Sequence, residues 1–316
     1  MIAIGIDIGG TYTKFCAVNS AGKILKTLRI NTDTALSARA FLHCLADIVN
    51  DWKRDFKGEK IVLGVGLPGI TDYETGIFRA GPNIPWRNLK VKEALERCTG
   101  RRCFIANDAS MAAWGVHATE LKSKYKNLMV MTLGTGIGGG IIIDGKPYRG
   151  ATGSAGEIGH TKIDFSANAP LCGCGDRGCL EAFCGAAGIK RAAVAAVKKS
   201  PKSILAALMA KEDFSVELLS EAAQRRDKTA MALWHDIGIN LGRAVANSAL
   251  ILNPQAVVLT GGVSRGAKYF KKSMLGVLKE QSVKAPFENL RILISKQNNI
   301  GGIGAAMYAL SKVNEK

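Results

Sequence analysis

The sequence predicts a duplicated α/β architecture, in which two α/β domains lie on either side of a cleft. Three segments share one design, an apolar strand that runs into a glycine turn: Ile2–Thr11, Leu128–Gly140 and Ala256–Val263. The first two continue into a second strand and a hairpin turn, at residues 20–22 and 144–145. Helical periodicity fills the intervals, and strands that alternate with helices are typical of a layered α/β fold.

The remaining elements follow from apolar spacing and from breakers. A helix is expected from about Thr34 to Lys53, because Phe41 and Trp52 belong to an apolar set at helical spacing. A second, long helix is stopped before Pro254. Further strands are expected at 61–65, 103–105, 256–259 and 291–294.

The length of 316 residues suits two domains. We expect an N-terminal α/β domain at residues 1–107 and a larger C-terminal α/β domain at residues 108–300. A last helix, at residues 301–316, is apolar on one side and is expected to dock on the first domain. No low-complexity linker separates the two domains, so the cleft between them is the expected binding site.

The composition is that of a globular protein without membrane spans. Of the residues 47% are hydrophobic, and no apolar run reaches the ~20 residues that a membrane helix needs. The start of the chain lacks the features of a secretory signal, so a cytoplasmic location is expected. The 43 Lys and Arg residues exceed the 26 Asp and Glu residues by 17, but they are spread along the chain. This spread favours a solvated basic surface over a nucleic-acid site.

Two glycine-rich turns are candidate phosphate-binding loops. Glycine lets the backbone N–H groups of Asp7–Lys14 and Gly134–Gly140 approach phosphate oxygens closely. An ordinary hairpin turn is the alternative for the first of them, and Asp7 can hold Mg²⁺ through water. With the later Gly261-Gly262, the two loops indicate a nucleotide held between two half-sites. The residues expected to bind nucleotide and Mg²⁺ are Asp7, Gly9, Gly10, Thr11, Lys14, Gly134, Thr135, Gly136, Gly138, Gly261 and Gly262.

A cluster of one histidine and three cysteines predicts a metal site. His160, Cys172, Cys174 and Cys179 offer four ligands for a tetrahedral Zn²⁺, and the glycines between them allow tight turns. Four protein ligands leave no open position, so the zinc would be structural. Unlinked packing thiols are the alternative, and Cys184 falls outside the turn on an expected helix.

Carboxylates stand at three further positions of interest. Asp108 and the preceding Asn107 follow a short strand and precede a helix, where a helix N-cap is the commoner role. The same position aims a carboxylate into a cleft at the end of a strand, where ligands bind in α/β sheets. Glu157 and Glu181 flank the predicted zinc turn, either as exposed carboxylates or as polar binding groups.

Together these motifs resemble the ROK family of sugar kinases and related repressors, which has the actin-like ATPase (ribonuclease H-like) fold. The strings Gly156-Glu-Ile-Gly-His160 and Cys172-Gly-Cys-Gly-Asp-Arg-Gly-Cys179-Leu-Glu181 carry the resemblance, which extends over nearly the whole chain. It implies an ATP-dependent kinase of carbohydrate metabolism, with Asp108 as the catalytic base. The sugar-binding residues that it implies are Asn107, Asp108, Glu157, His160, Glu181, Gly69 and Asn83.

Within the family the motifs look most like the glucokinase branch of glycolysis, which implies phosphorylation of the 6-hydroxyl of glucose. Kinases of N-acetylmannosamine or N-acetylglucosamine and fructokinases are the alternatives, and discrimination is expected to rest on loops around Gly69, Asn83 and Thr152–Ser154. A repressor is the alternative without enzymatic activity. It would carry an N-terminal helix-turn-helix, for which a strand starting at Ile2 leaves no room. The expected partners are a sugar, ATP and a second copy of the chain, without nucleic acid or membrane.

Overall fold

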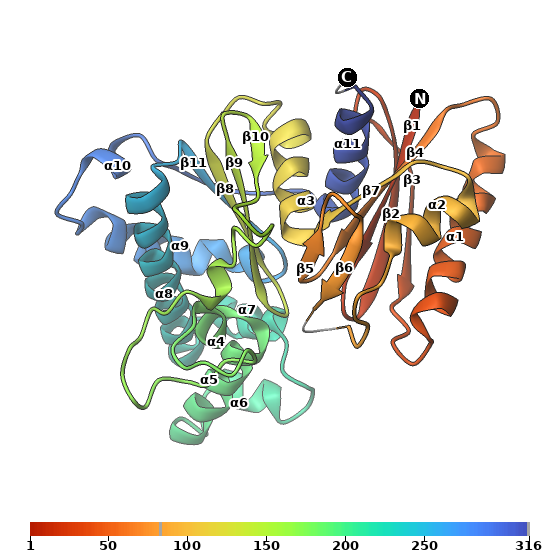
Figure 1. The fold of residues 1–316 in the computed structure, drawn as a ribbon. Coiled ribbons are helices and arrows are strands. Elements are labelled where there is room, and N and C mark those ends of the chain that lie inside the picture. The colour runs from red at the N-terminus through yellow and green to blue at the C-terminus, as the bar shows by residue number, and fades with distance from the viewer. Residues whose placement is uncertain (82–83, 315–316) are drawn as a thin grey trace. The chain divides into compact units, whose positions relative to one another are not determined.

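The computed structural model describes residues 1–81 and 84–314, and the chain divides into two compact units. The first unit comprises Met1–Lys126, Gly140–Gly156 and Gln297–Lys316, and the second comprises Asn127–Gly139 and Glu157–Lys296. Figure 1 shows the elements of both units on the ribbon. Among the described residues, no helix combines the length and the apolar character that crossing a membrane requires.

A five-stranded sheet with the order β3-β2-β1-β4-β7 forms the centre of the first unit. β1, β2 and β3 pair antiparallel as two consecutive hairpins, whereas β1, β4 and β7 run parallel. The carboxyl ends of the three parallel strands therefore meet at one edge of the sheet. The strands are β1 (Ile2–Ile8), β2 (Tyr12–Asn19), β3 (Ile24–Asn31), β4 (Ile61–Leu67) and β7 (Cys103–Asn107), and a small hairpin is formed by β5 (Ile70–Asp72) and β6 (Ile77–Ala80).

Helices cover both faces of this sheet (Figure 1). The apolar face of α1, with Leu45 and Trp52, is buried in one core with β1 and β4, and α11 packs on the other face. A methyl group on Gly5 or Gly64 would lie within 2 Å of a carbonyl oxygen of α11, so only glycine lets this helix approach so closely. The helices are α1 (Ala38–Asp55), α2 (Val91–Thr99), α3 (Asp108–Gly115), a π-helical turn (Val116–Glu120) and α11 (Ile300–Asn314).

The second sheet repeats the arrangement of the first, in the order β10-β9-β8-β11-β12. At one end of this sheet β10 pairs antiparallel with β9. At the other end β8, β11 and β12 run parallel. The strands are β8 (Leu128–Leu133), β9 (Ile137–Ile143), β10 (Lys146–Tyr148), β11 (Ala256–Thr260) and β12 (Arg291–Ile294). The helices of the second unit are α4 (Leu180–Cys184), α5 (Ala186–Lys199), α6 (Ile204–Met209), α7 (Val216–Gln224), α8 (Lys228–Leu252), α9 (Ala267–Lys279) and α10 (Ala285–Glu288), with 3-10 turns at Ile158–His160 and Val263–Gly266.

Two helix ends show how local chemistry sets the boundaries. The first helix begins later than the apolar spacing indicates, because the Ser37 hydroxyl accepts a hydrogen bond from Ala40 N at 3.2 Å and caps it. α8 ends where Asn253 adopts a left-handed conformation (φ 43°) ahead of Pro254, as the breaker predicts.

The ranges of the two units differ from the expected boundary between residues 107 and 108. Residues 108–126 and 140–156 group with the first unit. The reason lies in glycine contacts on α3: a methyl group on Gly115 would lie 2.9 Å from Gly304 Cα of α11, and one on Gly140 would lie 2.5 Å from Ala109 O. The Gly115 contact packs α3 against α11 of the first unit, and the Gly140 contact packs the start of residues 140–156 against α3.

Candidate functional site

Two carboxylates lie at the edge of the first sheet where its parallel strands end. Asp7 on β1 is in register with Gly66 on β4, and Gly66 is in register with Ala106, two residues before Asp108. A methyl group on Gly66 would lie 3.7 Å from Asp7 Oδ1 and 3.3 Å from Asp108 Cα. The structure therefore brings together two residues that are 101 positions apart in the sequence, with Gly66 between them.

Asp7 is held in a confined place beside the first turn of α11. A methyl group on Gly301 would lie 2.5 Å from Asp7 Oδ2, and Lys14 stands opposite Asp7 in the β1–β2 register. Burial raises the pKa of the Asp7 carboxyl above its ordinary value, and the Lys14 ammonium partly offsets this effect. A carboxylate whose ionised form is disfavoured in this way gains from a bound cation, which is consistent with the magnesium role expected for Asp7.

At the start of α3, Asn107 caps the helix and Asp108 does not. Asn107 is the helix N-cap: its Oδ1 accepts from Ser110 N at 3.1 Å, and its Nδ2 donates to Gly69 O at 3.2 Å. Asp108 is therefore the first helical residue, and its Oδ1 accepts from Ala109 N at 2.8 Å. Gly69 itself adopts φ 109°, and a methyl group there would lie 2.4 Å from Ala80 O. The predicted sugar residue Asn83 lies outside the described residues.

The first glycine turn joins β1 to β2. Gly9 N donates to Tyr12 O at 3.0 Å and closes the turn, which leaves Gly10 and Thr11 exposed at its tip. The hydroxyl of the neighbouring Thr13 is buried against that of Thr32, at 2.9 Å, so it points into the protein. The exposed backbone of this turn is the part that can contact a phosphate.

The second glycine turn, between β8 and β9, is anchored by side chains and by helix α4. Gly134 N donates to Gly136 O at 3.0 Å, and Gly138 N donates to the Thr132 hydroxyl at 3.2 Å. The Glu181 carboxylate accepts from Ile137 N at 2.8 Å. Gly261, with φ 95°, lies against the end of β8, where a methyl group on it would be 2.4 Å from Leu133 O.

The metal cluster of the second unit has the spacing of a tetrahedral site. The ligand atoms of His160, Cys172, Cys174 and Cys179 all lie within 4.8 Å of one another. Sulfurs bound to one tetrahedral zinc at about 2.3 Å stand about 3.8 Å apart. The Sγ atoms of Cys174 and Cys179 are 3.8 Å apart, and His160 Nδ1 is 3.8 Å from Cys172 Sγ. The four residues can therefore hold a zinc-sized ion, and Nδ1 of His160 is the nitrogen that faces it.

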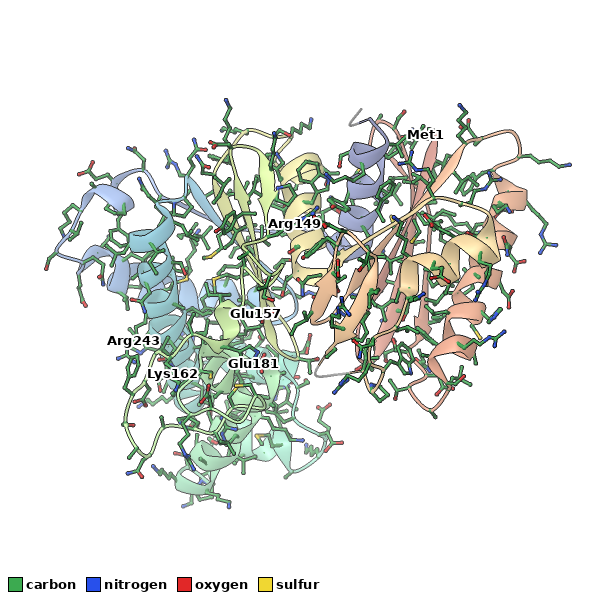
Figure 2. All side chains as sticks on the ribbon, in the orientation of Figure 1. Met1, Arg149, Glu157, Lys162, Glu181 and Arg243 are labelled. Carbon is green, nitrogen blue, oxygen red and sulfur yellow. The ribbon has the colours of Figure 1, made fainter. Side chains whose placement is uncertain are left out.

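The predicted sugar residues of the second unit stand around this cluster. Glu157 is exposed immediately before the 3-10 turn that carries His160, and that turn rests on β9 through Gly159. Glu181 Oε1 lies 3.7 Å from Cys172 Sγ, so Glu181 contacts both the metal cluster and the second glycine turn. Cys184 is buried apart from the cluster, 3.7 Å from Ile237 O. Figure 2 labels Glu157 and Glu181 among the side chains.

A hollow of about 270 Å³ opens beside Gly262 in the second unit. Its wall comes from α7 and from the segment after β11, and includes Glu217, Ser220, Arg265 and Tyr269. These residues have no signal in the sequence, because α7 precedes Gly262 by some forty positions and carries no motif of its own. The hollow offers aromatic, cationic and carboxylate groups next to the predicted nucleotide turn.

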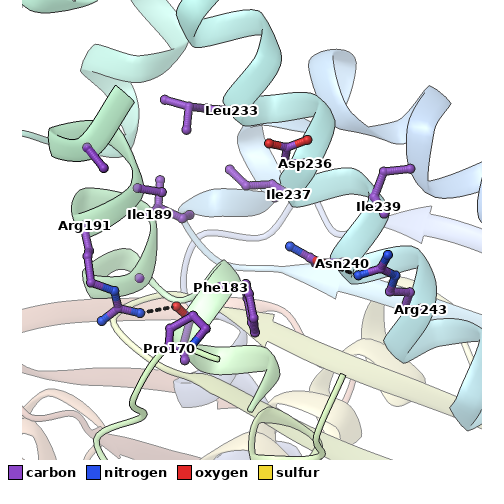
Figure 3. Close-up of a pocket in the computed structure, with 14 residues that line it drawn as sticks. Pro170, Phe183, Ile189, Arg191, Leu233, Asp236, Ile237, Ile239, Asn240 and Arg243 are labelled. Atoms are coloured by element: carbon purple, nitrogen blue, oxygen red, sulfur yellow. Dashed lines mark hydrogen bonds between the residues drawn. The ribbon is translucent and has the colours of Figure 1, made fainter. Parts of the chain in front are cut away.

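A second, larger hollow of about 480 Å³ lies between α4, α5 and α8 (Figure 3). Its wall is mainly apolar, with Phe183, Ile189 and Ile237, and the Arg191 guanidinium donates to Ala182 O at its rim. Among the residues that the structure describes, no predicted site residue lines it. Its lining residues Ala182 and Phe183 pack against Cys172 and Cys179, so the hollow adjoins the metal cluster.

Comparison with known proteins agrees with the fold and the motifs. Residues 3–312 match the model of the ROK family. A glucokinase of Halalkalibacterium halodurans is 36% identical over 272 residues, which are 83% of this chain and 80% of that protein. A xylose repressor of Caldicellulosiruptor bescii is 29% identical over 296 residues, or 93% of this chain and 74% of the repressor. The crystal structure of a ROK family glucokinase from Streptomyces griseus, in complex with glucose and AMPPNP, has 28% identity and a TM-score of 0.82, with 98% of this chain and 100% of that chain covered. The predicted actin-like α/β fold is confirmed.

Proposed function

The chain belongs to the ROK family, and from this premise we propose that it is an ATP-dependent hexose kinase that phosphorylates the 6-hydroxyl of glucose. Similarity to glucokinases supports a sugar kinase. The observation on the chain itself that carries the proposal is the pair of carboxylates, Asp7 and Asp108, on either side of Gly66. Phosphoryl transfer needs one group that orients the acceptor hydroxyl and another that helps to hold the metal–nucleotide complex.

Asp108 is the proposed general base. Its carboxylate accepts the proton of the sugar 6-hydroxyl while that oxygen bonds to the γ-phosphorus and the bond from phosphorus to the bridging oxygen of ADP breaks. The hydrogen bond from Ala109 N to Oδ1 restrains the orientation of the carboxylate, since the chain is already helical at this residue. Because the N-cap role belongs to Asn107, Asp108 does not have to cap the helix.

The sugar hydroxyls are assigned to the polar groups that the sequence predicts. In the first unit, Asn107 Nδ2 uses one N–H for Gly69 O and has a second N–H for the substrate, with Gly69 and Asn83 as further contacts. In the second unit, Glu157, His160 and Glu181 are proposed. Since Nδ1 of His160 faces the cysteines, Nε2 is the nitrogen that can bond to a hydroxyl.

The nucleotide is assigned to the glycine turns. The backbone around Gly9–Thr11 and Gly134–Gly136 is proposed to contact the phosphates, with Lys14 as a cationic neighbour. The hollow beside Gly262 is proposed to take the adenosine, because it adjoins the predicted nucleotide turn. Mg²⁺ bound near Asp7 would neutralise phosphate charge, and burial of this carboxyl supports that assignment.

Zn²⁺ is the metal proposed for the cluster of His160 and three cysteines. Three sulfurs and one imidazole nitrogen are a donor set that favours zinc, and the observed 3.8 Å separations fit tetrahedral coordination. When bound, the ion would cross-link the 3-10 turn that carries His160 to the cysteine segment that leads into α4 and Glu181. Its contribution is structural, because no ligand position remains open for a substrate.

A screen of hexoses with a coupled assay for ADP release tests the proposed activity. We expect turnover with glucose, and the variant Asp108→Asn is expected to lower kcat by about 100-fold or more, with KM for ATP little changed. Absence of turnover with glucose, mannose, fructose, N-acetylglucosamine and N-acetylmannosamine would refute the kinase. A rate for Asp108→Asn within about threefold of the wild type would refute the base.

The same screen decides between the sugars, because kinases of N-acetylmannosamine, N-acetylglucosamine or fructose are compatible with the same carboxylates and histidine. A sugar-responsive repressor is the second candidate function, supported by the similarity to the xylose repressor. Specific DNA binding that weakens steeply with salt, together with no turnover, would favour it. A homodimer is proposed as well, and a molar mass measured by light scattering tests it.

A further inference from the structure

Arg149 joins two tyrosines in the first unit. Its guanidinium carbon lies 4.3 Å from the ring centroid of Tyr73 and 5.7 Å from that of Tyr308, and its Nη2 donates a hydrogen bond to the Tyr308 hydroxyl. Figure 2 labels Arg149. Tyr308 is buried on α11 in a small core with Ala106 and Met111. A planar cation that contacts two rings limits their rotation. Through Arg149, the buried Tyr308 side chain therefore restrains the Tyr73 ring.

Tyr73 links two segments through its hydroxyl group. The hydroxyl accepts from Asn107 N and donates to Gly153 O, each at 3.4 Å. Gly153 adopts φ 80°, and a methyl group there would lie 2.8 Å from Tyr73 Cε2. The backbone at Gly153 therefore rests directly against the ring, while the same hydroxyl contacts the residue before Asp108.

The segment at residues 149–156 is a closed loop whose two ends meet. Ala155 N donates to Arg149 O at 3.0 Å, and Gly150 turns the chain with φ 69°. Tyr73 is itself fixed at the β5–β6 turn, because Asp72 Oδ1 accepts from Glu74 N at 3.2 Å. Arg149 and Tyr73 thus hold the loop from its first residue and from its middle.

We propose that Tyr73 and Arg149 are positioning residues that set the geometry of the sugar site. They hold Asn107 and Asp108 in a fixed relation to residues 149–156, a loop that contains Thr152–Ser154, one of the three segments expected to discriminate between hexoses. The proposal rests on the proposed hexose kinase. Neither residue takes part in the chemistry: the Tyr73 hydroxyl bonds to backbone groups, and Arg149 acts through the tyrosines.

The test uses two conservative variants and a matched control. Tyr73→Phe removes the hydroxyl and keeps the ring, and Arg149→Lys keeps the charge and removes the planar group. Arg102→Lys is the control, because Arg102 also stacks on an aromatic ring, that of Phe104 at 5.2 Å, in the same unit. For each protein, kcat and KM are measured for glucose, N-acetylglucosamine and ATP, and hydrogen exchange is followed in peptides over residues 105–110 and 149–156.

In Tyr73→Phe we expect kcat with glucose to fall by about tenfold, because small displacements of a positioned group are costly in rate. The preference for glucose over N-acetylglucosamine is expected to narrow, while KM for ATP stays within about twofold. Both peptides should exchange faster in Tyr73→Phe and Arg149→Lys, and neither kinetics nor exchange should change in Arg102→Lys.

Wild-type kinetics in both variants would overturn the proposal, even with faster exchange, since the loop would then be held without consequence for the sugar. Equal losses in Arg102→Lys would also overturn it, because they would indicate general destabilisation. If the wild type phosphorylates no hexose, the proposed function fails on its own. Unchanged exchange in Tyr73→Phe would then refute the positioning contact independently of any activity.

Discussion

Removal of the Glu181 carboxylate tests how the second glycine turn is held. Glu181 stands two residues after Cys179, at the start of α4, and its Oε2 accepts from Ile137 N at 2.8 Å. A methyl group on Gly136 would lie 2.4 Å from the same oxygen, so the turn rests directly on the carboxylate. The variant Glu181→Ala leaves the Ile137 N–H without this partner.

The size of the effect follows from that hydrogen bond. A bond to a charged group contributes about 1.5–3 kcal/mol, and Glu181 is partly exposed, which places it toward the lower end. We expect the free energy of unfolding to fall by about 2 kcal/mol. Urea denaturation followed by circular dichroism measures the change, which should shift the midpoint while the slope stays constant. The Ile137 amide should also exchange faster with solvent.

Glu157→Ala is the matched control, because Glu157 is an exposed carboxylate beside the same metal cluster. Its unfolding free energy is expected to stay within about 0.5 kcal/mol of the wild type. If Glu181→Ala lowers the unfolding free energy by less than about 0.5 kcal/mol, the hydrogen bond to Ile137 N does not stabilise the turn. An equal loss in both variants would also refute this stabilising role, since a general effect of charge would then explain the change.

Three further predictions concern the metal, the buried carboxyl and the helix contact. The purified protein is expected to contain one Zn²⁺ per chain by elemental analysis. Chelation or the variant Cys179→Ser should lower the melting temperature, because metal binding stabilises the folded state. A metal-free protein with an unchanged melting temperature would contradict the proposed zinc site. Burial raises the pKa of Asp7 above its ordinary value of 3.8, so the folded state binds the carboxyl proton more tightly than the unfolded state does. The ionised carboxylate therefore lowers the unfolding free energy at neutral pH. Below the ordinary pKa the group is protonated in both states, and this loss of stability disappears. Asp7→Asn should therefore raise the unfolding free energy at pH 7, with a gain that disappears below about pH 4 in urea titrations; a gain independent of pH would count against this cause. Gly64→Ala places a methyl group 1.8 Å from Ala305 O and should cost about 1–3 kcal/mol in urea denaturation, whereas a change near zero would mean that α11 shifts freely.

The fold class could be predicted from the sequence, because the patterns that indicate it extend over short stretches of chain. Each glycine turn follows an apolar strand within ten residues, and the repeat of this pattern predicts the repeated sheets that the structure shows. The approach of the four candidate ligands was predictable for the same reason: Cys172, Cys174 and Cys179 lie close in the chain, with glycines that allow the turn.

The rest depended on contacts between distant residues. The grouping of residues 108–126 with the first unit follows from glycine contacts between α3 and α11, which have no signature in either helix alone. Likewise, whether Asn107 or Asp108 caps α3 is a matter of one residue, and only the backbone conformation decides it. The hollow beside Gly262 is formed by side chains from α7 and α9 that no motif connects.

The sequence by itself determined the two glycine turns, the four residues of the candidate metal cluster and the family, because strand periodicity, turn chemistry and residue spacing act over short stretches of chain. Only the tertiary structure decided that Asp7 and Asp108 stand on either side of Gly66, that Glu181 supports the second glycine turn and that Arg149 fixes Tyr73. Each of these depends on strand register or helix packing, where a shift of one residue would turn the side chain elsewhere.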